Sequence, residues 1–380
     1  MEHQELADWL RLLLTPGIGN GSARKLLAAF GLPAAMLSQS PAVLAQVVGA
    51  AQAAALQQAP EDLAALLEST WNWLQADTAS RRILTLGDPL YPQSLLQTED
   101  PPLLLYAMGM AGAWSHNLLN ATACLAVVGS RNPSPQGAEN SRQFARALAD
   151  AGLCIVSGMA TGVDGAAHEG ALQAAAEGTL ATVAVVGTGL DRVYPGRHRD
   201  LAHRIAQQGL LLSEFALGTP PLAPHFPQRN RIIAGLSRGT LVVEAALQSG
   251  SLITARLAAE QGREVFAIPG SIHSTQSHGC HALIKQGAKL VESAQDVLEE
   301  LALDHAAEPD SDFVQTLPPE DASSDSALLR ALGHDPVGLD ALQARTGLPT
   351  QHLLAELMTL ELQGQVVRRP GGQYQRMTLA

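Results

Sequence analysis

The chain has few cysteines and lacks a long apolar run. Its three cysteines, Cys124, Cys154 and Cys280, are far apart, which argues against a disulfide framework and favours a reducing compartment. The opening segment MEHQELADWLRLLL carries acidic residues where a secretory signal has positive charge, and no apolar run has the length of a membrane span. We therefore expect a cytoplasmic protein without a membrane partner.

The chain also lacks an excess of positive charge. It has 24 Lys and Arg against 36 Asp and Glu, a formal net charge of −12. This balance excludes a protein coated evenly with basic groups, so any polyanion has to be met by a local cluster. Residues 125–300 are close to neutral, with 14 Lys and Arg against 15 Asp and Glu.

Three cofactor patterns are missing or incomplete. No Walker A sequence is present, which excludes a P-loop ATPase. The segment VVGTGLDRVYPG (185–196) has Arg192 where the dinucleotide fingerprint has its third glycine, so NAD binding is disfavoured. The segment IHSTQSHGCH (272–281) contains metal-ligand residue types but no second cluster at a suitable spacing. We expect neither a cofactor nor a metal ion.

Residues 1–80 are predicted to form a domain of short helices, similar to a SAM or helix-hairpin-helix unit. The segment TPGIGNGSARKLL (15–27) places a Gly-x-Gly turn between two amphipathic helices, and such glycines let backbone N–H groups approach a phosphate. A plain helical packing unit explains the same pattern, and both interpretations stay open. Residues 81–123 contain prolines and one candidate strand at 102–108, which predicts an extended connector packed on the core, without chemistry of its own.

From Cys124 onward the pattern becomes regular. The continuous apolar runs are CLAVVG, LCIVSG, LATVAVVG, LLLSEF, TLVVEA and EVFAIPG. Helix-length, Ala-rich segments lie between them. Strands that are apolar on both faces and alternate with helices predict an α/β fold with a doubly wound parallel sheet. We assign residues 124–301 to this Rossmann-like domain.

The remaining residues predict a linker and a second small domain. Residues 302–325 are acidic, contain Pro and Ser and have no Lys or Arg, as in a flexible linker. Residues 326–380 show three helical patterns followed by two strands around a Pro-Gly-Gly turn, the order of a winged helix. The candidate recognition helix carries Glu356 and Glu361 and no Lys or Arg, so we do not expect it to enter a DNA groove unaided.

Ligands of open α/β sheets bind beyond the carboxyl ends of the strands, near the point where the strand order reverses. The first two such ends, VVGSRNPSPQG (127–137) and SGMATGVDGAAHEGAL (157–172), combine small residues, hydroxyls and an arginine ahead of a helix. Backbone N–H groups, hydroxyls and a forked guanidinium suit a phosphate, although ordinary tight turns are the alternative. The candidate phosphate ligands at these ends are Gly129, Ser130, Arg131, Ser157, Gly158 and Thr161.

Asp164 and His168 stand one helical turn apart and have the residue types of an acid and a base. No nucleophile or metal set accompanies them, and such a pair more often caps a helix and packs. We predict no catalytic residue here.

The stretch HFPQRNRIIAGLS (225–237) lies between two predicted strands and belongs to the same edge. We expect Phe226 to stand on a stiff Pro-rich loop, where its ring can stack on a base. Arg229, Asn230 and Arg231 bring charge and hydrogen-bond donors to the ring, as single-strand binders do. The alternative is that the arginines pair with Glu214 and Glu244 at adjacent strand ends, and we expect one of them to do so.

The fourth strand end, QSGSLITARLAAEQG (248–262), opens another helix with hydroxyl groups near its start. Ser249, Gly250, Ser251 and Thr254 suit an anion, although helix capping alone explains Ser251. Four such strand ends on one edge of a sheet are together a specific signal.

These segments together resemble the DNA-processing protein A family (DprA, also called Smf). The resemblance runs closely through about 81–300, including GDPLYPQSLLQTEDPPLLLYAMG, VVGSRNPSPQG, IVSGMATGVDGAAHEGAL, FPQRNRIIAGLS and VVEAALQSGSLITARLAAEQGREVFAIPG. It implies a Rossmann-like domain that binds single-stranded DNA rather than a nucleotide cofactor. It further implies a homodimer formed through about 265–300, and a role in protecting incoming strands and loading the RecA recombinase during natural transformation.

The resemblance also implies roles for residues. An anion pocket falls on Gly129, Ser130, Arg131, Ser157, Gly158, Arg229, Asn230, Arg231, Ser249, Gly250 and Ser251, and a base-stacking ring on Phe226. Two other functions remain as alternatives. One is a nucleotide phosphoribohydrolase, whose PGGxGTxxE loop is matched only in part by SRGTLVVEA (237–245), and the other is a winged-helix transcription regulator.

Overall fold

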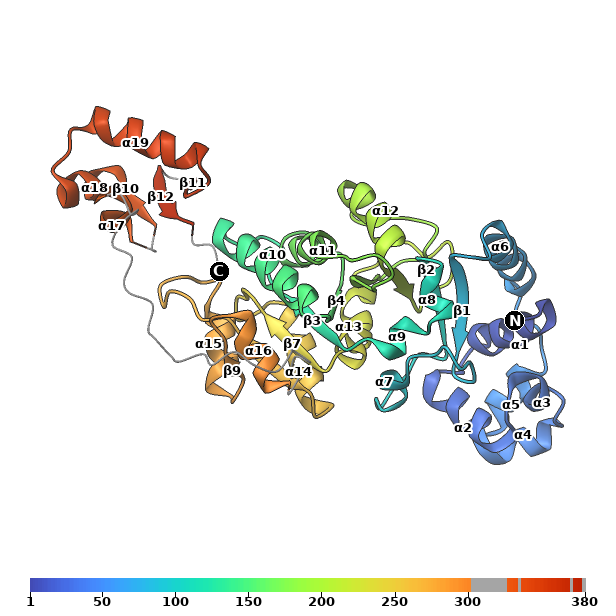
Figure 1. Ribbon diagram of the computed structural model, residues 1–380. Coiled ribbons are helices and arrows are strands. Elements are labelled where there is room, and N and C mark those ends of the chain that lie inside the picture. The colour runs from blue at the N-terminus through green and yellow to red at the C-terminus, as the bar shows by residue number, and fades with distance from the viewer. Residues whose placement is uncertain (302–326, 334–335, 370–371, 378–380) are drawn as a thin grey trace, which may run out of the picture.

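The computed structural model describes residues 1–301, 327–333, 336–369 and 372–377, and Figure 1 shows how their elements are arranged. The predicted acidic linker, 302–325, lies outside these residues. No helix in the described ranges combines the length and the apolar character needed to cross a bilayer.

Six helices make up the N-terminal region, which Figure 1 shows beside the β1 edge of the sheet. Their apolar sides meet around the fully buried Leu6, Trp9, Leu10 and Leu26. The elements are α1 (His3–Leu14), α2 (Asn20–Phe30), α3 (Pro33–Leu37), α4 (Pro41–Val48), α5 (Ala50–Leu56) and α6 (Leu63–Ala76).

The central sheet has nine strands in the order β1-β2-β6-β5-β4-β3-β7-β8-β9. Strands β3 to β9 run parallel, as predicted from their continuous apolar runs, and the strand order reverses at β3, between β4 and β7. Their bounds are β3 (Cys124–Val128), β4 (Cys154–Ser157), β5 (Thr182–Val185), β6 (Leu210–Ser213), β7 (Gly239–Val242), β8 (Glu264–Ala267) and β9 (Lys289–Leu290).

Helices cover both faces of this sheet, so the predicted doubly wound architecture is confirmed. On one face Leu125 and Val127 of β3 pack under α10, α11 and α16, and on the other Ala126 and Val128 pack under α13, α14 and α15. The helices are α10 (Pro135–Asp150), α11 (Val163–Gln173), α12 (Arg199–Gln208), α13 (His225–Leu236), α14 (Ser251–Glu260), α15 (His278–Lys285) and α16 (Ala294–Glu300). A 3₁₀ turn, η1 (Gly196–His198), precedes α12.

The segment between the N-terminal helices and β3 contributes to the sheet, which its interpretation as a connector did not anticipate. β1 (Arg81–Thr85) pairs with β2 (Leu104–Gly109), and β2 runs antiparallel to β6. These two strands cover an edge that β6 would otherwise expose. Short helices complete the segment: α7 (Gln93–Leu96), α8 (Gly112–Ser115) and α9 (Leu118–Ala121).

The C-terminal elements form the predicted winged helix. A three-stranded sheet in the order β10-β12-β11 packs with three helices around Leu328, Leu342, Leu353 and Leu357. The elements are α17 (Ala327–Leu332), β10 (Val337–Gly338), α18 (Leu339–Thr346), α19 (Thr350–Leu362), β11 (Val366–Arg369) and β12 (Gln373–Arg376).

Candidate nucleic-acid interface

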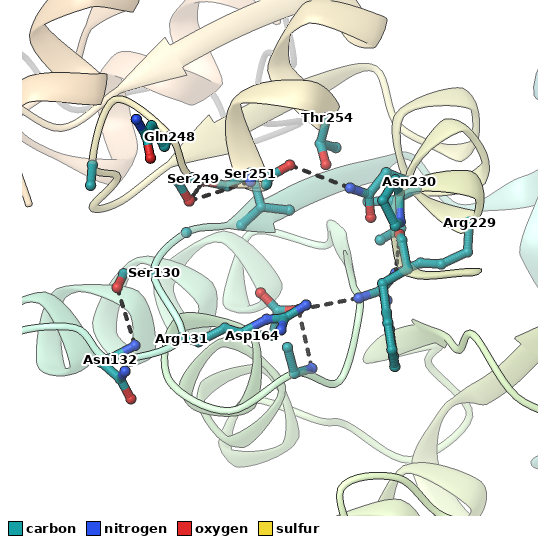
Figure 2. A pocket seen from close by; sticks show the side chains of 18 of the residues that line it. Ser130, Arg131, Asn132, Asp164, Arg229, Asn230, Gln248, Ser249, Ser251 and Thr254 are labelled. Atoms are coloured by element: carbon teal, nitrogen blue, oxygen red, sulfur yellow. Dashed lines mark hydrogen bonds and ion pairs between the residues drawn. The ribbon is translucent and has the colours of Figure 1, made fainter. Parts of the chain in front are cut away.

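A cavity of about 500 Å³ opens at the carboxyl ends of β3 and β7, where the strand order reverses. This is the place where open α/β sheets bind ligands. Figure 2 shows the groups that converge on it from the loop after β3, from α13 and from the start of α14. The predicted residues that line it are Gly129, Ser130, Arg131, Phe226, Arg229, Asn230, Ser249, Gly250, Ser251 and Thr254.

A smaller cavity of about 130 Å³ adjoins the first and shares Arg131, Phe226 and Arg229 with it. The predicted residues Gly158 and Thr161 lie here rather than in the larger cavity. Ten of the predicted residues thus line the larger cavity, and two more line the smaller one.

The structure places two predicted residues outside both cavities. Ser157 is fully buried, and its hydroxyl donates to the carbonyl of Val127 at 2.7 Å, so it joins two strands. Arg231 pairs with Glu214, one of the two predicted partners, and its Nε lies 3.4 Å from a carboxylate oxygen of Asp100. Both side chains therefore interact with other groups of the protein and do not face either cavity.

Phe226 lies in the first turn of α13, and the expectation of a stiff loop is wrong at this position. Pro224 is the N-terminal cap residue of the helix, and Pro227 lies within the first turn, where a proline N–H is not needed. The helix brings Phe226, Arg229 and Asn230 to one side, because residues three and four apart share a helix face.

The Phe226 ring has two close neighbours. The guanidinium carbon of Arg131 lies 5.5 Å from its centroid, within cation–π range, and the Tyr194 ring lies 5.6 Å away at an interplanar angle of 37°. Tyr194 was not predicted from the sequence. It follows the carboxyl end of β5, so the strand-end rule applied to the segment 185–196 would have found it.

Arg229 forms part of the cavity wall and is buried. Its guanidinium donates to the carbonyl of Val185, and its Nη2 lies 3.9 Å from a carboxylate oxygen of Asp164. Burial lowers the pKa of Arg229 to about 10, while Asp164 acts in the opposite direction. Burial raises the pKa of Asp164 above its ordinary value, against the attraction of Arg229. Their mutual pairing compensates two charges that would be costly apart.

Glycine at position 158 is required by this buried arginine. A Cβ placed on Gly158 would lie 1.9 to 2.1 Å from three atoms of the Arg229 guanidinium, which is closer than any real contact. Gly129 is confined in a similar way, because its Cβ would lie 2.8 Å from the carbonyl oxygen of Glu244. Both glycines therefore let neighbouring groups approach the backbone.

Glu244 bonds to Ser134 rather than to an arginine, contrary to one of the two pairings considered. Its carboxylate accepts hydrogen bonds from the backbone N–H of Ser134 at 2.8 Å and from the Ser134 hydroxyl at 2.5 Å, at the N-terminus of α10. The anion position at that helix start is thus filled by the protein. A phosphate in the cavity has to be held by other groups.

Those groups are Arg131 and the start of α14. The Arg131 side chain is exposed, while its backbone carbonyl accepts a hydrogen bond from the Thr161 hydroxyl at 3.1 Å. At the start of α14 the hydroxyls of Ser249 and Ser251 lie 2.7 Å apart, and the Asn230 amide donates to the Gly250 carbonyl at 3.4 Å. Gln248 and Gln276 also line the cavity and were not among the predicted residues.

The structure favours the packing interpretation of His168. It is fully buried, and its Nδ1 lies 2.7 Å from the hydroxyl of Thr182, which itself donates to the Ile155 carbonyl. Burial, with His198 and Arg229 as smaller causes, lowers its pKa to about 3. The ring is therefore neutral and donates its Nδ1 proton to Thr182.

Two histidines of the segment 272–281 lie against backbone carbonyls of the same loop. His278 and His281 place their Nε2 atoms 3.0 Å from the carbonyl oxygens of Ile272 and Gly270. Among the residues that the structure describes, no group of three or more His, Cys, Asp or Glu is placed to hold a metal ion.

The two flanking regions offer less to a polyanion. In the N-terminal hairpin Arg24 pairs with Asp100, and the Asn20 amide donates to the same carboxylate at 3.4 Å, which favours the packing interpretation. On the outer side of α19 the apolar residues Leu354, Met358 and Leu362 are 43%, 65% and 83% exposed.

Two family models match this chain. The model of the family described as DNA recombination-mediator protein A matches residues 82–302, and that of the DprA winged helix domain matches 315–372. Protein Smf of Escherichia coli is 43% identical over 310 residues, which cover 80% of each chain. DNA processing protein DprA of Streptococcus pneumoniae is 50% identical over 213 residues, 56% of this chain and 72% of that protein.

Two solved structures are similar as well. The X-ray structure of DNA processing protein A from Streptococcus pneumoniae has a TM-score of 0.65 and 39% identity, covering 79% of this chain and 98% of that one. DNA processing protein A from Helicobacter pylori, a structure that concerns that protein's single-stranded DNA binding mode, has a TM-score of 0.51 and 31% identity, covering 58% and 96%. The chain therefore belongs to the DNA recombination-mediator protein A family.

Proposed function

We propose that this protein binds single-stranded DNA at the carboxyl edge of its sheet and acts as a recombination mediator. The observation that carries the proposal is the convergence of Arg131, Phe226, Asn230 and the hydroxyls of α14 on one cavity. A guanidinium and hydroxyls suit a phosphate, and a ring beside them suits a base. The single-stranded DNA binding of the Helicobacter pylori relative supports the same ligand here.

The arrangement favours a single strand over a duplex. A base that stacks on Phe226 has to be free of its own pairing partner. Because Arg131 and Tyr194 lie close to the ring, such a base either displaces one of them or stacks on ring surface that they leave uncovered. Within the described part of the chain, the cavity lining presents no row of cations for a duplex backbone.

A dimer is part of the proposal. Arg131 is the exposed cation of the cavity, so one cavity holds a strand weakly, and two cavities on one strand raise the avidity through effective concentration. The interface is proposed within 265–300, where Ile272 and Leu290 are 73% and 44% exposed. Replacing Leu290 by Asp is expected to shift the molar mass measured by light scattering from dimer to monomer, whereas an unchanged mass contradicts this interface.

The protein is further proposed to load RecA on the bound strand in the cytoplasm, without an enzymatic activity of its own. The three buried free cysteines suit a reducing compartment. A phosphoribohydrolase needs a free acid in the cavity, but Glu244 is bonded to Ser134 and Asp164 is paired with Arg229. Free adenine released from AMP by the protein would revive that alternative.

The central test is binding by fluorescence anisotropy of a labelled oligothymidylate and of a duplex of equal length, at several salt concentrations. We expect tighter binding of the single strand and an affinity that falls linearly with salt on a double-logarithmic plot, by about 0.7 per phosphate contact. Equal affinity for both ligands contradicts the proposal. RecA loading is tested separately, by whether the protein shortens the lag before RecA hydrolyses ATP on a strand covered with single-strand binding protein.

A further inference from the structure

A second group of basic side chains lies beside the cavities. Residues 192–204 contain four arginines and two histidines against one aspartate, in a chain whose formal net charge is −12. Arg192 is paired with the preceding Asp191 at 2.9 Å. The other three arginines of the segment, Arg197, Arg199 and Arg204, have exposed side chains on η1 and α12.

These three guanidinium groups are not used inside the molecule. Within the described ranges, the guanidinium groups of Arg197, Arg199 and Arg204 form no hydrogen bond and no ion pair. The one acid of the segment, Asp200, lies next to Arg199 in sequence. By contrast, Arg229 and Arg231 are held by carboxylates. Unpaired cations that repel one another are retained at some cost, and that cost is offset when a polyanion binds.

The position of the segment connects it to the cavities. Tyr194 and Pro195 line the smaller cavity, and Arg197 follows two residues later. His198 anchors η1 to the cavity wall, because its Nδ1 lies 3.1 Å from the carbonyl oxygen of Met159. A strand that passes the Tyr194 ring, which is 48% exposed, therefore comes directly to η1 and the start of α12.

We infer that Arg197, Arg199 and Arg204 form a basic track that binds the phosphates of the same single strand after it leaves the cavity. The inference rests on the proposed function and adds a second contact region to it. The track offers guanidinium groups without a ring or an enclosed base site, so it binds the sugar–phosphate backbone without regard to sequence.

The test compares short and long ligands. Oligothymidylates of about 4 nucleotides occupy the cavity alone, while those of about 20 nucleotides reach both regions. In the variant R197Q/R199Q we expect unchanged affinity for the short ligand and roughly tenfold weaker binding of the long one at low salt. The salt slope for the long ligand should fall by about 1.4, because two single-strand phosphate contacts are lost.

The matched control is R146Q/R238Q, which removes the same amount of charge at the amino ends of the strands, opposite the carboxyl ends that form the cavities. Arg146 lies in the last turns of α10 and Arg238 directly before β7, so both are at the amino ends of the strands. This variant should bind long and short ligands as the parent does. If it weakens long-ligand binding as much as R197Q/R199Q, the effect is one of net charge and the track is refuted.

A third variant separates this inference from the proposed function. Arg131→Ala is expected to weaken binding of both ligands. If it does so while R197Q/R199Q leaves the long-ligand affinity and salt slope unchanged, the track is wrong and the proposed function stands. If Arg131→Ala leaves both ligands unaffected, the cavity assignment itself fails.

Discussion

The sheet edge and the winged helix both belong to architectures that bind nucleic acid, yet they differ in what they offer. At the carboxyl edge Arg131 is exposed beside Phe226 and the hydroxyls of α14. The third helix of the winged helix, α19, carries two glutamates and exposes Leu354, Met358 and Leu362. A phosphate backbone is attracted by exposed cations, whatever fold carries them. Charge and exposure therefore separate the sheet edge from α19, and the architecture alone does not.

Arg131→Ala should produce the largest change, because it removes the exposed cation of the cavity. Loss of a hydrogen bond to a charged group costs about 1.5–3 kcal/mol, or roughly 10- to 150-fold in affinity for single-stranded DNA. Anisotropy titrations at two salt concentrations measure both this loss and a decrease of about 0.7 in the salt slope. An unchanged salt slope would show that Arg131 does not contact a DNA phosphate, and the contrast between the cavity and the winged helix would then be lost.

Phe226→Ala comes next. Base–aromatic stacking contributes about 1–3 kcal/mol per base in single-strand binders, and this loss should leave the salt slope as it is. Phe226→Tyr is the matched control, because it keeps the ring, and it should retain most of the affinity. Equal losses in both variants would show that Phe226 supports α13 and does not stack on a base.

The pair of Arg231 and Glu214 should affect the stability of the fold rather than the binding of DNA. Burial, with Asp100 as a smaller cause, raises the pKa of Glu214 to about 7, although Arg231 opposes this. In the folded protein Glu214 therefore keeps its proton up to about pH 7, whereas in the unfolded chain it releases the proton near its ordinary pKa. Protonation of Glu214 thus contributes fully to the stability of the fold at acidic pH, and this contribution is lost as the pH rises through about 7.

Glu214→Gln removes this titration. We expect the melting temperature of the variant to fall less than that of the parent between pH 5 and pH 8, a difference in unfolding free energy of about 1–3 kcal/mol. Single-strand affinity at fixed pH should stay within about twofold, the range of a site without ligand contact. The same pH dependence in both proteins would assign the titration to another group.

The smallest effect is expected in the winged helix. Arg368 and Arg369 lie on β11 next to α19, and replacing both by Gln should weaken binding of single strand or duplex by less than about threefold, as for exposed charges outside a site. A loss as large as that of Arg131→Ala would reverse the comparison and give the winged helix a DNA-binding role.

Much of the fold was accessible from residue patterns. Six apolar runs from Cys124 onward correspond to strands β3 to β8, because strands buried on both faces need apolar residues at every position. β1 was missed, since RRILT begins with two arginines, which are only partly buried, and lies at the edge of the sheet. Whether an isolated short segment joins a sheet depends on a partner strand that its own residues do not specify.

The candidate site was predicted to a similar degree. The strand-end rule identified the loops that meet at the cavity, and ten of the proposed residues line it. It did not separate Ser157, which bonds to Val127, from Ser249 and Ser251, which face the cavity. Serines at strand ends look alike in a sequence, and only the direction of the hydroxyl decides their role.

What the sequence determined by itself is the layered architecture and the edge on which the small, polar and basic residues gather, because hydrophobic periodicity and strand direction are local properties. Tertiary structure decided which of those residues face a ligand. Arg229 and Arg231 are two residues apart on α13, about 200° around a helix with 3.6 residues per turn, so they point to different sides. Burial against Asp164 holds one at the cavity wall, and Glu214 with Asp100 holds the other away from it.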